Sequence, residues 1–94
     1  MAKLETNFPV IIHGLVTAAV EKSGYANKAV PVEPVVLVCG APGTYSSNHA
    51  IQLGHALRCN PRLLAAIWRD LMLPHLGAIR VEVNGHGFLT FFTN

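Results

Sequence analysis

Histidine and cysteine are the side chains of this sequence best suited to bind a metal ion or to transfer a proton. The 94 residues include five histidines and two cysteines, namely His13, His49, His55, His75, His86, Cys39 and Cys59. No Cys-x-x-Cys or His-x-x-x-His pair occurs, and His49 and His55 lie six positions apart, which places them on different faces of a helix. A structural zinc ion needs four ligands. We therefore expect no metal site, reduced thiols, and histidines that are exposed or hydrogen-bonded.

Acidic residues are too scattered to supply a general acid–base pair. Beyond Glu33 the only carboxylates are Asp70 and Glu82, and no spacing suggests a nucleophile beside a base. We therefore expect no catalytic residues and no cofactor in this chain.

Residues 35–47, VVLVCGAPGTYSS, resemble a phosphate-binding loop in context, because an apolar run leads through glycines toward a predicted helix. Such a loop has the pattern G-x-x-x-x-G-K-[ST]. Here Tyr45 occupies the position of the second Gly, and Ser46 occupies that of the Lys. Without the Gly the backbone cannot close around phosphates, and without the Lys the charge that holds them is missing. We interpret residues 40–43 as a loop ahead of a helix.

Residues 46–74 predict two helices that meet at a corner. Ser46 or Ser47 is a suitable N-cap for the first helix, and Asn60-Pro61 is a strong start signal for the second. Pro74 ends the second helix. Apolar residues follow each start at helical spacing. They are Ala50, Leu53, Gly54 and Leu57 in the first helix, and Leu64, Ile67, Trp68 and Leu71 in the second.

An earlier helix is predicted to begin at Thr6 or Asn7 with Pro9 and to end at Gly24. Its apolar face consists of Ile12, Leu15, Val16 and Ala19. Residues 25–34 contain two prolines and form a connector. The run Val35–Cys39 predicts a central strand buried on both faces, because it is unbroken and rich in β-branched valine.

The last seventeen residues predict a β-hairpin. In residues 78–83 apolar and charged side chains alternate, and in residues 88–92 Phe88, Thr90 and Phe92 share one face while Leu89 and Phe91 share the other. Asn84-Gly85 between them predicts a tight turn with positive φ at both positions, which His86-Gly87 could extend. The order of elements predicts an α+β fold: a small, mostly antiparallel sheet of three or four strands with about three helices on one face.

Composition predicts one domain over residues 1–94. Apolar residues make up 51% and charged residues only 13%, against a typical charged share of about 25%. No run approaches the roughly 20 apolar residues that span a bilayer, and the N-terminus lacks the pattern of a signal peptide, so we expect a cytoplasmic protein. The net charge of +2 is too small for nucleic-acid binding by charge alone.

Three segments together resemble the N-terminal additional domain of arginyl-tRNA synthetases. Residues 43–53, GTYSSNHAIQL, are similar to the family's G-D-Y-x-x-N-x-A-x-x-L, and residues 60–65, NPRLLA, to its N-P-R-x-I-A. Residues 85–92, GHGFLTFF, are similar to its closing hairpin G-P-G-F-x-N-F. The resemblance covers about half of the chain, from Gly43 onward.

This resemblance implies an α+β accessory domain that contacts the D-loop at the outer corner of tRNA and has no catalytic residues of its own. The family's base-contacting aromatic corresponds to Phe88, and the polar residue two positions further on corresponds to Thr90. An exposed aromatic ring can stack on an unpaired base, and a polar neighbour can hydrogen-bond to the edge of that base. Lysine is scarce after Lys28, so phosphate contacts would fall to arginines, with Arg58, Arg62 and Arg80 as the candidates.

The departures from the family pattern support an alternative. Thr90 is shorter than the family's Asn, and Leu63 and Ile67 stand where the family usually places charged residues. If Leu63 and Ile67 lie outward beside Trp68, they form an apolar patch for a second copy or a partner domain. The alternative is therefore a protein-interaction module on the same fold, either free-standing or part of a longer enzyme.

Overall fold

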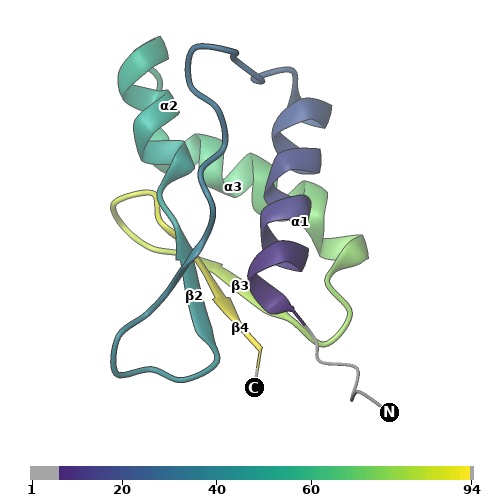
Figure 1. The fold of residues 1–94 in the computed structure, drawn as a ribbon. Helices are drawn as coiled ribbons and strands as arrows, with labels where there is room; N and C mark the ends of the chain where they lie inside the picture. The colour runs from purple at the N-terminus through teal and green to yellow at the C-terminus, as the bar shows by residue number, and fades with distance from the viewer. Residues whose placement is uncertain (1–6, 94) are drawn as a thin grey trace.

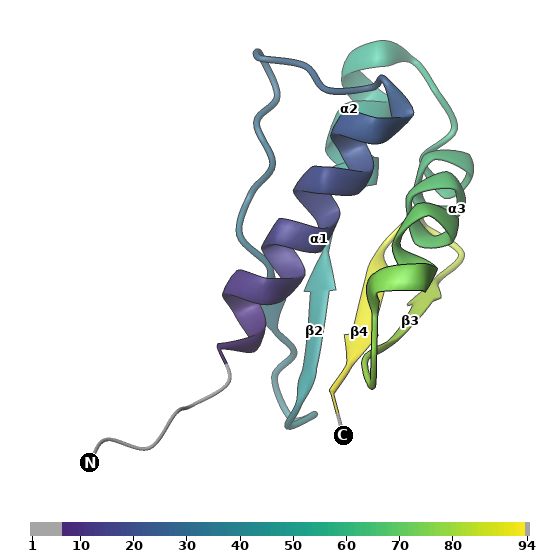
Figure 2. The same ribbon diagram turned by 90° about the vertical axis from the view of Figure 1, so that its right-hand side faces the viewer.

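The computed structural model describes residues 7–93 and confirms the predicted α+β architecture. Its elements are α1 (Phe8–Ser23), β1 (Val36–Leu37), β2 (Thr44–Ser47), α2 (His49–Leu57), α3 (Pro61–Met72), the 3-10 helix η1 (Leu73–His75), β3 (Arg80–Val83) and β4 (Leu89–Phe92). The strands form one sheet in the order β1-β2-β4-β3, and all three neighbouring pairs are antiparallel. Helices α1 and α3 cross the same face of the sheet, and α2 continues beyond the end of β2 (Figures 1 and 2).

Two helices begin where the sequence predicts. The side chain of Asn7 accepts a hydrogen bond from the amide of Val10 at 3.3 Å, and that of Asn60 accepts one from the amide of Arg62 at 2.9 Å. These bonds satisfy amide hydrogens that have no partner within the first helical turn. Thr6, the other predicted cap, lies outside the described residues. At its other end, α1 is terminated by Gly24 with φ +83°.

The prediction that Ser46 or Ser47 is the N-cap of α2 is wrong in part. Thr44–Ser47 is strand β2, which pairs along its whole length with β4, and α2 begins after Asn48. The hydroxyl of Ser47 nevertheless accepts a hydrogen bond from the amide of His49 at 3.3 Å. The strand forms because β4 supplies backbone partners, which no local pattern in residues 44–47 reveals.

The predicted central strand over Val35–Cys39 is also wrong. Only Val36 and Leu37 form a strand, β1, and it lies at the edge of the sheet, where these two side chains are 65% and 55% exposed. Val35 alone points into the core. The run is placed at the edge because the Gly40–Gly43 turn folds it back onto β2.

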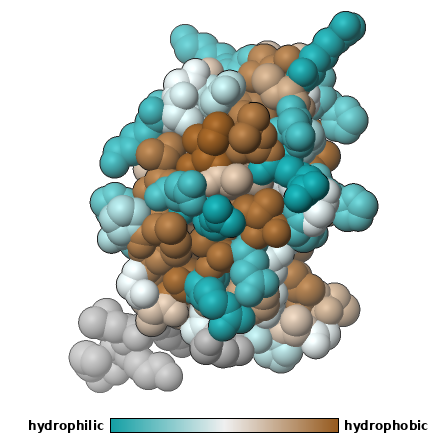
Figure 3. Space-filling model, turned by 180° about the vertical axis from the view of Figure 1, so that it is seen from behind, coloured by the Kyte–Doolittle hydropathy of each residue, from teal (hydrophilic) through white to brown (hydrophobic). Residues whose placement is uncertain are grey.

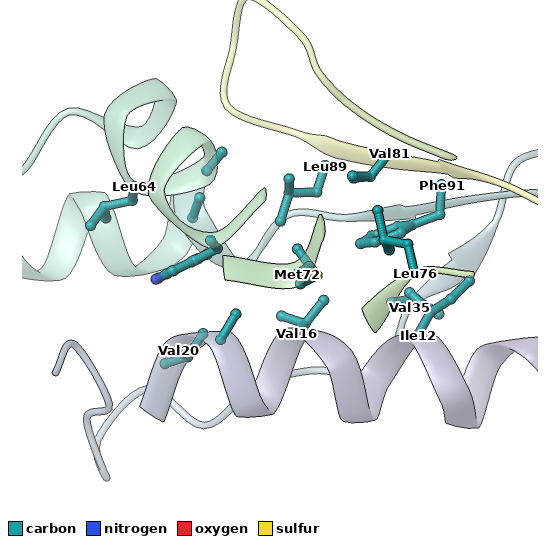
Figure 4. Packing of buried hydrophobic residues seen from close by; sticks show 14 of the residues in the cluster. Ile12, Val16, Val20, Val35, Leu64, Met72, Leu76, Val81, Leu89 and Phe91 are labelled. Carbon is teal, nitrogen blue, oxygen red and sulfur yellow. The ribbon is translucent and has the colours of Figure 1, made fainter. Parts of the chain in front are cut away.

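The core lies between the helices and the inner face of the sheet (Figure 4). Its largest fully buried side chains are Trp68, Phe91, Ile12, Leu53, Leu64, Met72 and Leu89. The indole nitrogen of Trp68 donates to the hydroxyl of Ser23 at 2.9 Å, which ties α3 to the end of α1. Burial of Leu89 and Phe91 confirms the predicted alternation of β4, so Phe88, Thr90 and Phe92 belong to the other face.

Candidate nucleic-acid interface

Among residues 7–93, no helix covers the face of the sheet opposite α1 and α3, and the strand register arranges the side chains of that face in rows. Thr90 of β4 lies between Ser46 of β2 and Glu82 of β3. One step along the strands, Phe92 lies between Thr44 and Arg80. Because side chains alternate along a strand, all six residues project from this helix-free side, which we call the open face.

Arg80 is held on the open face by two contacts. Its guanidinium carbon lies 4.4 Å from the centre of the Phe92 ring, and its Nε lies 3.5 Å from a carboxylate oxygen of Glu82. Both members of the ion pair are exposed, so this bond is weak in water. A guanidinium resting on an aromatic ring remains available to a phosphate, so Arg80 is a suitable anion contact.

Phe88 is positioned by the loop that joins β3 to β4. The side-chain oxygen of Asn84 accepts hydrogen bonds from the amides of His86, Gly87 and Phe88 at 2.9, 3.1 and 3.0 Å. Within this loop φ is positive at Gly87 (+102°) and not at Asn84 or Gly85. The positive φ predicted for Asn84 and Gly85 is therefore wrong, and the turn extends through His86-Gly87, as the sequence also allowed. The loop is a longer turn closed by a left-handed glycine. The sequence signal at Asn84-Gly85 located the turn but not this capping role of Asn84.

The same loop is packed against the start of α3. A Cβ atom added at Gly87 would lie 2.7 Å from Cβ of Pro61, closer than real Cβ contacts come. Only glycine therefore fits there, and the loop and α3 hold each other in place. Phe88, the next residue, is therefore held in a fixed position relative to α3.

Phe88 is half-buried and lines a hollow of about 540 Å³. The other walls come from Ser46 of β2, from Asn48 and Gln52 at the start of α2, and from residues 33–36, where the connector leads into β1. The aromatic ring is thus neither a core residue nor a fully exposed one, and the hollow beside it is open to solvent.

The three predicted arginines lie in different parts of the fold. Arg80 lies on the open face, and Arg62, in the first turn of α3, lines a second hollow of about 420 Å³ with Asn84 and Gly85 of the loop. Arg58 ends α2 in a left-handed conformation with φ +57°. Helix α2 runs away from the sheet (Figure 1), so Arg58 lies about 9 Å along the helix axis from Gln52 and about 15 Å from Asn48, which both border the Phe88 hollow.

A comparison with protein-family models decides the family. The model described as "Arginyl tRNA synthetase N terminal domain" matches residues 11–93, which is most of the chain. The chain belongs to this family. A comparison with curated proteins found no match. The three segments that carried the resemblance are β2 with the start of α2, the start of α3, and the β3–β4 loop with β4. In this arginyl-tRNA synthetase N-terminal domain they lie side by side around the Phe88 hollow and the corner between α2 and α3.

The prediction that Leu63, Ile67 and Trp68 form an apolar surface patch is wrong at Trp68. Trp68 is 0% exposed, so it belongs to the core and not to the surface. Leu63 is 60% exposed, and Ile67 is half-buried at the edge of the core. On the side of this family member opposite to Figure 1, apolar side chains form several areas separated by polar ones (Figure 3).

One buried polar residue was missed by the sequence analysis. His49, expected to be exposed or hydrogen-bonded, is 1% exposed, and neither ring nitrogen has a hydrogen-bond partner within residues 7–93. Its ring stacks on that of Trp68, with centroids 5.4 Å apart and planes 22° apart. Burial lowers the pKa of His49 below its ordinary value, and the nearby carboxylate of Glu33 opposes this shift in part. Burial therefore favours the neutral imidazole in the folded domain.

Within residues 7–93 no group of three or more histidine, cysteine, aspartate or glutamate side chains is arranged to hold a metal ion. Cys39 and Cys59 are both free thiols. None of the helices in the described part of the chain combines the length and apolar character needed to cross a membrane.

Proposed function

We propose that this arginyl-tRNA synthetase N-terminal domain binds the outer corner of tRNA at its D-loop, in the cytoplasm, and performs no chemistry itself. Phe88 stacks on an unpaired base, Thr90 hydrogen-bonds near it, and Arg58, Arg62 and Arg80 contact phosphates. The observation that carries the proposal is the position of Phe88, which the Asn84 loop holds half-exposed beside an open hollow. An aromatic ring kept accessible in this way is suited to stacking.

Substitution of Phe88 tests this proposal. Phe88→Ala should weaken binding to an unmodified arginine tRNA transcript by about 1–3 kcal/mol, because that is the usual contribution of one base–aromatic stack. Fluorescence anisotropy of labelled tRNA measures the change, and Phe88→Tyr should retain most of the affinity because its ring also stacks.

The matched control is Leu73→Ala, which truncates an exposed apolar side chain that lines neither hollow. Its affinity should equal that of the parent. Equal binding by Phe88→Ala and the parent would contradict the proposal.

The second candidate function is docking of a second copy or a partner domain, and the exposure of Leu63 favours it. Leu63 lies with Arg62 and Arg69 along the hollow beside the β3–β4 loop, so a partner bound there would also contact the loop. Sedimentation at high concentration tests self-association. A parent that forms dimers while Leu63→Glu stays monomeric would support this alternative, and a strictly monomeric parent would exclude its self-association form.

A further inference from the structure

The outer face of α1 is apolar over most of its length, although it is exposed. Val10 and Ile11 are 64% and 44% exposed, and Gly14 and Ala18, further along the same side, are exposed as well. No aspartate, glutamate, lysine or arginine occurs in α1 before Glu21. A surface helix normally carries polar side chains on the side that faces away from the core. This face therefore fits burial against a second surface better than contact with water.

A groove of about 380 Å³ runs beside this face, between α1 and the end of α3. Apolar side chains of both helices line it, and its polar lining residues are two basic ones. The apolar lining includes Ile11, Leu15, Leu71 and Met72, and the basic residues are Lys22 and His75. The groove can therefore accept an apolar side chain from another molecule.

The spacing along the face fits a second helix. Ile11, Gly14, Ala18 and Glu21 follow one another at intervals of three, four and three residues, which is the pattern of helices that pair along their length. The two central residues are small, and a Cβ atom added at Gly14 meets nothing within 4 Å. Because the distance between packed helices depends on the side chains at the contact, a second helix can approach α1 closely here.

The charge of Glu21 favours an antiparallel partner. Glu21 lies in the last turn of α1, where a negative charge opposes the dipole of its own helix, and its side chain makes no ion pair within residues 7–93. An antiparallel copy of α1 would place Glu21 beside the first turn of the other α1. That turn contains no acidic residue, and its amide hydrogens concentrate positive charge. Twofold symmetry makes this contact twice.

We propose that a second copy of this chain docks on this face, with the two α1 helices antiparallel around a twofold axis near Gly14. Ile11 of each copy then lies against the groove of the other. The contact goes beyond the proposed function, because none of the residues assigned to tRNA binding lies on α1. It also differs from the surface around Leu63, which belongs to α3. A contact one helix wide is small, so the dimer forms at high protein concentration.

Sedimentation equilibrium of the 94-residue chain at low salt tests the proposal, over chain concentrations from about 10 µM to about 1 mM. The parent should form dimers. Ala18→Lys should raise the dissociation constant about tenfold or more, because it adds a bulky charge to an exposed position at the centre of the contact. Glu21→Gln should raise it about three- to thirtyfold, because two favourable charge–dipole contacts are lost.

Leu63→Glu is the matched control, because it places a charge at a 60% exposed apolar position that does not line the groove. It should dimerise as the parent does, and so should Phe88→Ala, which separates this proposal from tRNA binding. Urea unfolding of Ala18→Lys at low concentration should match that of the parent, which shows that the variant folds.

A parent that stays monomeric over the whole range overturns the proposal, and so does equal dimerisation of Ala18→Lys, Glu21→Gln and the parent. Loss of the dimer in Leu63→Glu but not in Ala18→Lys also overturns it, because the contact would then lie on α3. None of these results affects the proposed binding of tRNA.

Discussion

At the scale of single residues, His49 stands out as the only buried histidine among residues 7–93. It is buried at the start of α2, stacks on Trp68, and has no hydrogen-bond partner within residues 7–93. Burial lowers its pKa, so the folded domain binds a proton less readily than the unfolded chain does. Protonation therefore favours unfolding.

This linkage predicts a pH-dependent loss of stability. Above pH ~6.5, the unfolded pKa of histidine, both states are neutral and the contribution of His49 is complete. As the pH falls below that value, the unfolded chain binds the proton first, and the free energy of unfolding decreases. Urea unfolding at pH 7.5 and pH 5.0 should show a smaller decrease for His49→Leu than for the parent.

The control is His55→Leu, which removes an exposed histidine from the same helix. It should show the same decrease as the parent, because an exposed side chain is surrounded by water in the folded and the unfolded chain alike. If His49→Leu lost as much stability on acidification as the parent, the buried imidazole would not be the source of the effect.

At the scale of elements, the corner between α2 and α3 is built around Gly54. A Cβ atom added there would lie 2.9 Å from the carbonyl oxygen of Cys59 and 2.9 Å from Cγ of Pro61. Arg58 turns the chain in a left-handed conformation, and the amide of Cys59 donates to the carbonyl of Gly54 at 2.9 Å. The helices approach so closely because residue 54 has no side chain.

Replacing glycine by alanine should therefore have opposite effects on the free energy of unfolding at two positions. Gly54→Ala should lower the free energy of unfolding by about 1–3 kcal/mol, because the added methyl group overpacks the corner. Gly14→Ala on α1, where a Cβ atom meets nothing within 4 Å, should raise it by about 0.5–1 kcal/mol through helix propensity. Chemical denaturation of both variants measures the difference. Destabilisation by Gly14→Ala, or none by Gly54→Ala, would contradict this account of the corner.

At the scale of the whole molecule, the small net charge limits how much of any RNA affinity is electrostatic. The chain carries +2, and its three candidate phosphate contacts, Arg58, Arg62 and Arg80, are spread over α2, α3 and β3. Stacking and base contacts in the Phe88 hollow must then supply much of the specificity.

Binding to a tRNA transcript should accordingly show a shallow salt dependence. About three phosphate contacts predict that affinity falls roughly twenty- to fortyfold between 50 and 200 mM salt. Arg80→Gln should reduce the slope of log affinity against log salt by about one contact, and Phe88→Ala should weaken binding without changing the slope. A slope that corresponds to six or more phosphate contacts would show that Arg58, Arg62 and Arg80 are not the main phosphate ligands.

Local signals in the sequence were sufficient to predict much of this fold. Asn7 and Asn60-Pro61 mark helix starts because a cap and a proline act within one turn of the chain. The alternation of residues 88–92 separates Leu89 and Phe91 from Phe88, Thr90 and Phe92 because a strand has only two faces. Strand β2 and the edge position of β1 were missed, since both depend on pairing with distant segments.

By itself the sequence determined the family, the class of fold and the face on which Phe88 lies, because caps, periodicity and three short motifs are local properties. Only the tertiary structure decided that Trp68 is buried while Leu63 is exposed, since helical spacing groups residues without saying which group faces the sheet. It also decided that Asn48 and Gln52 border the same hollow as Phe88. These residues are about forty positions apart in the sequence, and the pairing of β2 with β4 brings them together. No local pattern in the sequence predicts that pairing.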